Sequence, residues 1–215
     1  MKKLFLLVIV LFAVQVAISQ NACNANVPGW GENLGVVSFY TDSVWTIEGN
    51  GITQRWSNAV TATACQKTTF DGGLAGNFNA DCRTNPGFPG DLFSWCAVYR
   101  FANQLCPYPW RVPTAEDFVN LDLAMGGDGT RRTSGLTETS VGSFVRDNFL
   151  NIWGGVFGGR CNPNGSLRGQ AWNGSYWSSA DSPEGGVRFY FTSSGCVNPN
   201  ISYSKGFGLL VRCVR

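Results

Sequence analysis

The stretch from Cys106 to Gly127 constrains the fold most, because several independent local signals in it agree. The residues before Pro113 are pushed out of the α region of backbone space, so an extended segment precedes the turn. Thr114 stands where a helix N-cap belongs, and Asp117 follows three residues later as the acidic partner of a capping box. Apolar residues then recur at helical spacing until two glycines end the run. We therefore predict an extended segment followed by a helix from Thr114, and we expect this stretch to be structural.

The first residues have the pattern of a signal peptide. Lys2 and Lys3 precede a long apolar run, and small residues stand at cleavage spacing up to Ser19. We expect a secreted or cell-surface protein. Its predicted divisions are a signal peptide over 1–19, an N-terminal segment over 20–44 and one folded domain over 45–215.

Membrane attachment of the mature chain is not expected. No second apolar run is long enough to span a bilayer. A lipid anchor at Cys23 is disfavoured, though still open, because Gln20 stands where such an anchor requires an aliphatic residue.

Charge and composition exclude several classes of function. Without Lys2 and Lys3, the 16 basic residues become 14 and equal the 14 acidic ones, so nucleic acid is not the expected partner. The chain has no histidine, which excludes Ser-His-Asp and Cys-His catalysis and the common histidine metal sites. We expect no cofactor.

Eight cysteines remain after cleavage, an even number in an exported chain. Disulfide bonds are therefore the default reading of these residues. No CxxC pair occurs, so a zinc ribbon or a thioredoxin-type site is not expected.

The remaining pattern predicts strands at both ends of the chain and helices between them, which is the α+β class. Residues 36–56 alternate like a hairpin around Asn50-Gly51, and residues 61–89 form a glycine-rich insertion with Cys65 and Cys82 as its staples. Asp91 is placed to cap a helix over 92–104. Further predicted elements are a helix over 141–152 that ends at Gly154 and Gly155, and strands over 175–180, 187–197 and 207–214. In the middle strand, Val187, Phe189 and Phe191 alternate with polar residues, as in a half-buried antiparallel strand.

Three segments resemble a known family: FSWCAVYRFANQLCPYPWRVPTAEDF at 93–118, YWSS at 176–179 and KGFGLLVRCVR at 205–215. Together they are similar to the Fibrobacter succinogenes major paralogous domain of exported Bacteroidetes proteins. The resemblance runs from about Trp45 to the end, and the segments 65–89 and 128–170 are longer than the family suggests. It implies a C-type lectin-like fold, near the Lcl C-terminal and formylglycine-generating sulfatase modifier domains. Such a fold has antiparallel strands, two to three helices and long disulfide-stapled loops.

The same resemblance implies disulfide pairings. By analogy with the lectin fold, Cys106 pairs with Cys213 and ties the helix-capping stretch to the last strand. The further expected pairs are Cys161 with Cys196, Cys65 with Cys82, and Cys23 with Cys96.

A candidate ligand surface lies on the polar members of the last strands and their loops. Its predicted residues are Trp172, Asn173, Tyr176, Asp181, Arg188, Tyr190, Asn198, Asn200, Tyr203 and Lys205. Aromatic rings beside amides and cations suit sugars, because a ring stacks on a pyranose face while polar groups bond its hydroxyls. They suit protein surfaces equally well, and the alternative is that they are ordinary solvated strand faces.

Neither a lectin-type calcium site nor catalytic chemistry is expected. Asn198-Pro199-Asn200 faintly resembles one lectin calcium triplet, but Trp172-Asn173 continues into glycine where the second triplet needs a carboxylate. Weak calcium sites remain open at two carboxylate pairs: Asp122 with Asp128, and Asp181 with Glu184. A cysteine enzyme would need Cys213 as a free thiolate, which a disulfide removes.

We thus expect a non-catalytic binding or adhesion module that recognises a glycan or protein on a cell surface. The alternatives are an accessory subunit of a larger surface assembly and a degenerate enzyme of the formylglycine-generating type.

Overall fold

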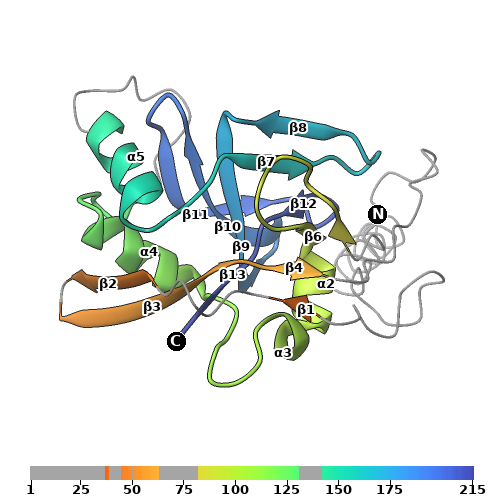
Figure 1. The fold of residues 1–215 in the computed structure, drawn as a ribbon, viewed down its shortest axis with the longest axis horizontal. Helices are drawn as coiled ribbons and strands as arrows, with labels where there is room; N and C mark the ends of the chain where they lie inside the picture. Colours follow the sequence, from red (N-terminus) through yellow and green to blue (C-terminus); the bar gives the residue numbers. More distant parts are fainter. Residues whose placement is uncertain (1–36, 39–44, 50, 63–81, 131–141) are drawn as a thin grey trace, which may run out of the picture.

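The computed structural model describes residues 37–38, 45–49, 51–62, 82–130 and 142–215 (Figure 1). Within them the chain is a mixed α/β protein built mostly from antiparallel strands, with few helices. The predicted signal peptide and most of the N-terminal segment lie outside these residues, as do Cys23 and Cys65.

The early hairpin forms as predicted. Strand β2 (Trp45–Gly49) pairs antiparallel with β3 (Ile52–Ala59), and Gly51 takes the left-handed conformation of the turn, with φ of 75°. The last strand, β13 (Arg212–Val214), then pairs with β3, so segments from the two ends of the described chain form one three-stranded sheet.

The helix-capping stretch is also confirmed. Arg111 forms an antiparallel bridge with Val214, and helix α4 (Ala115–Ala124) begins directly after the Thr114 cap. Both halves of the capping box are made, because the Thr114 hydroxyl accepts from the Asp117 N–H and the Asp117 carboxylate accepts from the Thr114 N–H at 2.7 Å.

The predicted helix over 92–104 is wrong at its start. Residues Leu92–Ser94 form strand β6, which pairs with β5 (Cys82–Arg83) and β12 (Gly208–Leu209). The extended backbone sends Leu92 into one hydrophobic core and Phe93 into another, which a helix would not do. The cap is Ser94, while the Asp91 carboxylate accepts from the Ala62 N–H at 2.8 Å.

The helical part of that segment is split in two. Helix α2 (Trp95–Arg100) breaks at Phe101 and is followed by α3 (Ala102–Leu105). The later predicted helix is α5 (Gly142–Asn151), which ends before Gly154, a residue with φ of 67°.

The C-terminal half adds two sheets. Strands β9 (Asn173–Ser182), β10 (Gly185–Thr192) and β11 (Val197–Tyr203) form a three-stranded antiparallel sheet with β10 at its centre. Strands β7 (Gly158–Cys161) and β8 (Leu167–Gln170) form a hairpin that joins β5, β6 and β12. A short pair, β1 (Val37–Ser38) with β4 (Thr61–Ala62), completes the described strands.

Hydrophobic clusters cover both faces of the β9–β11 sheet. Phe189 and Phe191 point to the side of α4 and α5, where Phe189 lies 5.1 Å from Phe118 and 4.9 Å from Phe149 between ring centroids. Trp177 points the other way, into the cluster with Trp95 on α2. β10 is therefore the antiparallel strand that was predicted, but the prediction of half burial is wrong, because the polar face of the strand is covered too.

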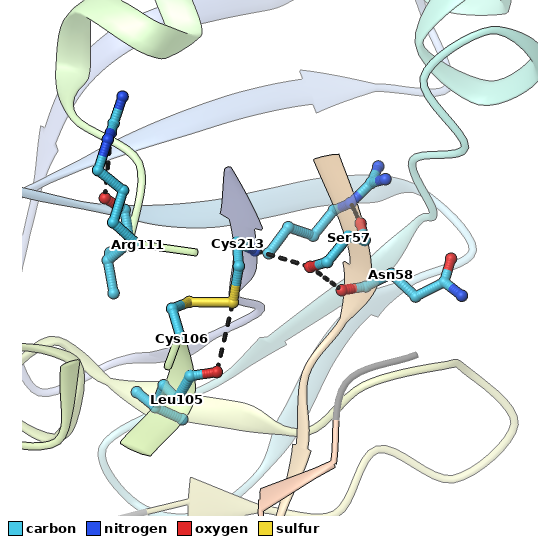
Figure 2. Close-up of a disulfide and its surroundings, with 8 residues drawn as sticks. Ser57, Asn58, Leu105, Cys106, Arg111 and Cys213 are labelled. Atoms are coloured by element: carbon cyan, nitrogen blue, oxygen red, sulfur yellow. Dashed lines mark hydrogen bonds between the residues drawn. A yellow bond between two sulfur atoms is a disulfide. The ribbon is translucent and has the colours of Figure 1, made fainter. Parts of the chain in front are cut away.

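The disulfide between Cys106 and Cys213 is confirmed, with a Cα–Cα distance of 5.5 Å (Figure 2). It joins the end of α3 to β13, where the Cys213 N–H also donates to the Ser57 hydroxyl at 2.8 Å. Cys82 and Cys96 are both disulfide-bonded, and their predicted partners lie outside the described residues.

The predicted pair Cys161 with Cys196 is wrong, since both thiols are free. Cys161 is buried in the cluster that contains Phe189, on the helix side of the sheet. The Cys196 sulfur instead accepts from Asn198, which lies opposite Tyr190 in the strand register. Residues that alternate along a strand face opposite sides, so the sheet separates the two thiols.

The environment of Asp117 predicts how the stability of the fold depends on pH. Burial raises the pKa of its carboxyl, but hydrogen bonds from Arg111 and Thr114 and the charge of Arg111 outweigh this, so the pKa lies below its ordinary value. The unfolded state then binds more protons as the pH falls below about 4, and the stabilisation present at pH 7 is lost there. We expect Asp117→Asn to lower the unfolding free energy by about 1–3 kcal/mol at pH 7.

Urea unfolding of both proteins at pH 7 and pH 3 checks this. The difference in unfolding free energy between wild type and Asp117→Asn should be smaller at pH 3 than at pH 7. Glu116→Gln, which changes an exposed carboxylate in the same helix turn, should differ less from wild type at both pH values. A difference that stays constant from pH 7 to pH 3 would contradict the depressed pKa.

Candidate functional site

The face of the β9–β11 sheet opposite α4 and α5 carries a cation between two rings. The Arg188 guanidinium carbon lies 3.6 Å from the centroid of the Tyr203 ring and 4.5 Å from that of Tyr190. Its Nη1 donates to the Ser175 hydroxyl at 3.1 Å. Contacts at these distances hold a cation by its attraction to the ring faces.

This arrangement extends onto the β7–β8 hairpin. Arg160 lies over the ring of Phe207 at 5.8 Å and is close enough to Arg188 to act on its charge. Arg168 lies directly opposite Arg160 in the strand register. We call this continuous surface the arginine–aromatic face; its residues are Arg160, Arg168, Trp172, Asn173, Arg188, Tyr190, Asn198, Tyr203 and Phe207.

Burial dominates the electrostatics of the face. It lowers the pKa of Arg188 to about 10, with Tyr203 and Tyr190 opposing the shift and Arg160 adding to it. Burial also raises the pKa of Tyr190, so its hydroxyl stays protonated at neutral pH. The hydroxyl donates to the Asn173 amide oxygen at 3.3 Å. The face thus presents a cation, phenols and an amide in one region.

Trp172 forms the exposed rim of the face. It follows Ala171, which takes a left-handed conformation with φ of 66° in the turn between β8 and β9. The side chain of Trp172 is 68% exposed, although its backbone is held by Gly169 and Ser193. A large ring held out on a tied backbone suits stacking against a ligand.

Asp181 and Lys205, also predicted as ligand residues, pair with each other. The Lys205 ammonium lies 2.8 Å from the Asp181 carboxylate and 4.6 Å from the centroid of the Trp95 ring. Lys205 is buried, so both charges are largely occupied in holding the β9–β10 hairpin end to α2.

Tyr176 was predicted to face a ligand, and this prediction is wrong. Its side chain is fully buried in the helix-side core, and its hydroxyl accepts from the Val156 N–H at 2.8 Å. Burial raises its pKa to about 12. Tyr176 lies opposite Phe189 in the register, so it shares the inward face of the sheet. Asn200, by contrast, is exposed on β11.

The sequence reasoning missed Arg160, Arg168 and Phe207. A signal for the two arginines exists, because Asn164-Gly165 is a hairpin turn pair with polar residues alternating on either side, and Gly165 has φ of 81°. No sequence pattern indicates that this hairpin lies beside β10.

The carboxylate pairs considered for calcium make structural hydrogen bonds. Asp122 is buried and accepts from the Gly129 N–H at 2.9 Å, and Asp128 accepts from both the N–H and the hydroxyl of Thr130. Within the part of the chain that the structure describes, no cluster of three or more Cys, Asp or Glu side chains could hold a metal ion.

Neither Cys213 nor Cys161 is an activated nucleophile. The Cys213 sulfur is bonded to Cys106. Burial raises the pKa of the Cys161 thiol, although the charge of Arg83 opposes the shift. A thiol with a raised pKa is mostly protonated at neutral pH and therefore a poor nucleophile.

A depression of about 480 Å³ lies elsewhere, along residues 84–91 and the ends of β3 and β4. Its two buried polar side chains are committed to the frame: Asn85 donates to the Gly158 carbonyl at 2.8 Å and Asp91 accepts from Ala62. We therefore place the candidate site at the arginine–aromatic face.

Fold and site together define a mixed α/β protein whose C-terminal antiparallel sheet carries the arginine–aromatic face. Comparisons of the chain with known protein families, with curated proteins and with solved structures found no match. Among the helices of the described residues, none combines the length and the apolar character needed to cross a bilayer.

Proposed function

We propose that this protein is an exported, non-catalytic binding module that recognises a glycan, or else a protein, on a cell surface through the arginine–aromatic face. The observation that carries the proposal is the exposed Trp172 ring at the start of β9, where the next residue, Asn173, accepts a hydrogen bond from Tyr190. A ring of this kind stacks on the apolar face of a sugar, while the amide and phenol bond its hydroxyls.

We further propose a C-type lectin-like fold related to the Fibrobacter succinogenes major paralogous domain. Two features of this chain support it: β13 pairs with β3, so that the early hairpin meets the last strand, and the Cys106–Cys213 disulfide ties the capping stretch to β13. A loop-rich half that presents ligands is what such a fold implies.

An accessory subunit of a surface assembly is the second candidate. It is favoured by Tyr108, which is 97% exposed in the turn after α3, away from the arginine–aromatic face. A tyrosine in that position is available to a protein partner, as are the tyrosines of antibody loops. A degenerate enzyme of the formylglycine-generating type is not favoured, because its candidate cysteine is bonded.

Replacing Trp172 by alanine tests the proposal. We expect the full mature chain to bind a subset of a glycan array, and Trp172→Ala to weaken that binding about tenfold, because a stacked ring contributes about 1–2 kcal/mol. Array fluorescence and titration calorimetry give the affinities. Since the ring is exposed, the melting temperature should hardly change.

Tyr108→Ala is the matched control, an exposed aromatic residue outside the face. Glycan binding that falls with Tyr108→Ala but not with Trp172→Ala would move the site to the turn after α3. If the chain binds no glycan but binds a cell-surface protein, the result would favour the accessory-subunit alternative.

A further inference from the structure

We propose that the arginine–aromatic face selects anionic glycans, whose sugars carry carboxylate or sulfate groups; this inference rests on the proposed function and names its ligand class. The ligand chemistry is an anionic oxygen for the arginines and a sugar face for the exposed ring.

Within the described residues, no carboxylate forms an ion pair with an arginine of the face. The ion pairs observed among the described residues are Arg111 with Asp117 and Lys205 with Asp181, and neither involves the face. Arg160 and Arg168 lie directly opposite each other on the β7–β8 hairpin, where like charges destabilise strand pairing. Arg160 makes only a 3.3 Å hydrogen bond from Nε to the Asn162 side chain and its contact with Phe207. A binding anion would relieve this repulsion.

Arg188 is a buried cation with an unused donor. The residue is 6% exposed, and its Nε has no hydrogen-bond partner in the part of the chain that the structure describes. The groups that act on its charge are Tyr203, Tyr190 and Arg160, none of which is a carboxylate. A buried donor without an acceptor is destabilising, and more so when it carries charge. An anionic oxygen above the Tyr190 and Tyr203 rings would be attracted by this cation.

Asn198 supplies an unused acceptor next to these rings. It is 3% exposed, and its Oδ1 has no hydrogen-bond partner, while its Nδ2 donates to the Cys196 sulfur at 3.4 Å. Asn198 lies opposite Tyr190 in the β10–β11 register. Oδ1 is itself shielded from solvent, so Asn198 adds polarity beneath the rings, and a ligand meets the more exposed Arg160 and Arg168 instead.

The rings and the two hairpins form one continuous surface. The Asn173 side chain lies against Gly169, where an added Cβ would be 2.5 Å from Asn173 Nδ2. This close approach places β8 beside Asn173, and the Trp172 N–H donates to the Gly169 carbonyl at 3.1 Å. Stacking rings flanked by unpaired arginines match a sugar chain with a charge on some or all of its residues.

The test measures binding of the full mature chain to three glycan probes. Polygalacturonate carries carboxylates, chondroitin sulfate carries carboxylates and sulfates, and dextran is neutral. We expect both acidic probes to bind and dextran to bind at least tenfold more weakly. Binding should weaken as sodium chloride rises from about 50 to 300 mM, because salt screens exposed charges.

The deciding variant is the pair Arg160→Gln and Arg168→Gln, with Arg55→Gln, an exposed arginine of β3, as the matched control. The pair should lose acidic-glycan binding by about tenfold for each arginine, since a charge-assisted hydrogen bond of that kind corresponds to about one decade in affinity. Arg55→Gln should bind as the wild type does, and circular dichroism should show all three proteins folded.

The outcomes separate the two proposals. Equal binding of dextran and the acidic probes, or unchanged binding by the double variant, overturns the anionic selectivity and leaves the glycan-binding function standing. Failure of every glycan probe overturns both. Tighter binding of a single-stranded DNA oligonucleotide than of either acidic glycan overturns the assignment to glycans. Preference for chondroitin sulfate over polygalacturonate, with loss in the double variant, supports the proposal and identifies sulfate as the preferred anion.

Discussion

Replacing Cys106 and Cys213 together by alanine is expected to lower the free energy of unfolding by about 4–5 kcal/mol. The disulfide closes a loop with a sequence separation of 107 residues. Closing a loop of that length removes much of the conformational entropy of the unfolded chain. The bond also joins α3 to β13, so its loss frees the strand that pairs with the early hairpin (Figure 2). Urea unfolding followed by far-ultraviolet circular dichroism measures the change.

The control for this variant is Cys196→Ala, which removes a free thiol and should change the unfolding free energy by less than about 1 kcal/mol. Alkylation of the urea-unfolded, non-reduced protein adds a second check. Cys161 and Cys196 should be labelled and Cys106 and Cys213 protected. Two reactive thiols at Cys106 and Cys213 would contradict the disulfide and revive the cysteine-enzyme alternative.

Phe189→Ala is expected to have the next largest effect, a loss of about 3–5 kcal/mol. Phe189 is fully buried, and its ring lies within 5.5 Å of the Phe118, Phe149 and Trp153 rings, measured between centroids. Removing it leaves a cavity between the central strand of the sheet and two helices, because the surrounding rings relax only in part. Chemical denaturation of the purified variant gives the value.

Phe189→Leu keeps most of the volume and should cost clearly less than the alanine variant, about 1.5 kcal/mol or below. Trp172→Ala provides the contrast on the surface, with an expected change of no more than about 0.5 kcal/mol. A Phe189→Ala variant as stable as Trp172→Ala would show that the sheet does not pack on α4 and α5 as described.

Several elements were predictable because their signals are local. The capping box needs only Thr114 and Asp117, three residues apart, and the turn needs only Asn50-Gly51 between alternating segments. Such interactions lie within a few residues along the chain, so the same geometry forms whatever surrounds it. The α+β pattern of strands, helices and then strands followed from these local assignments.

The start of α2 was mispredicted because a distant strand overrides local preference. Leu92 and Phe93 fit a helical face equally well, but β12, more than a hundred residues later, pairs with them and directs them into separate cores. The alternation of polar and apolar residues along β10 led to the wrong prediction of half burial for the same reason. Arg188 reads as a solvent-facing residue until Tyr203 and the second core cover it.

The candidate site shows where local information ends. Periodicity alone places Arg188 and Tyr190 on a late strand, with Trp172 and Asn173 in the loop before the preceding one, and their chemistry suggests a ligand surface. Which of the ten predicted residues share a face depends on strand register. In the observed register Tyr176 lies in the core, while Arg160 and Arg168 of the neighbouring hairpin lie near β10. The amino-acid order thus decided the capped helix, the first hairpin and the residue types available for binding, since those depend on neighbours in the chain. Tertiary structure alone decided the free thiols at Cys161 and Cys196, the buried guanidinium of Arg188 and the arginine–aromatic face, because each depends on pairing between segments that the chain keeps far apart.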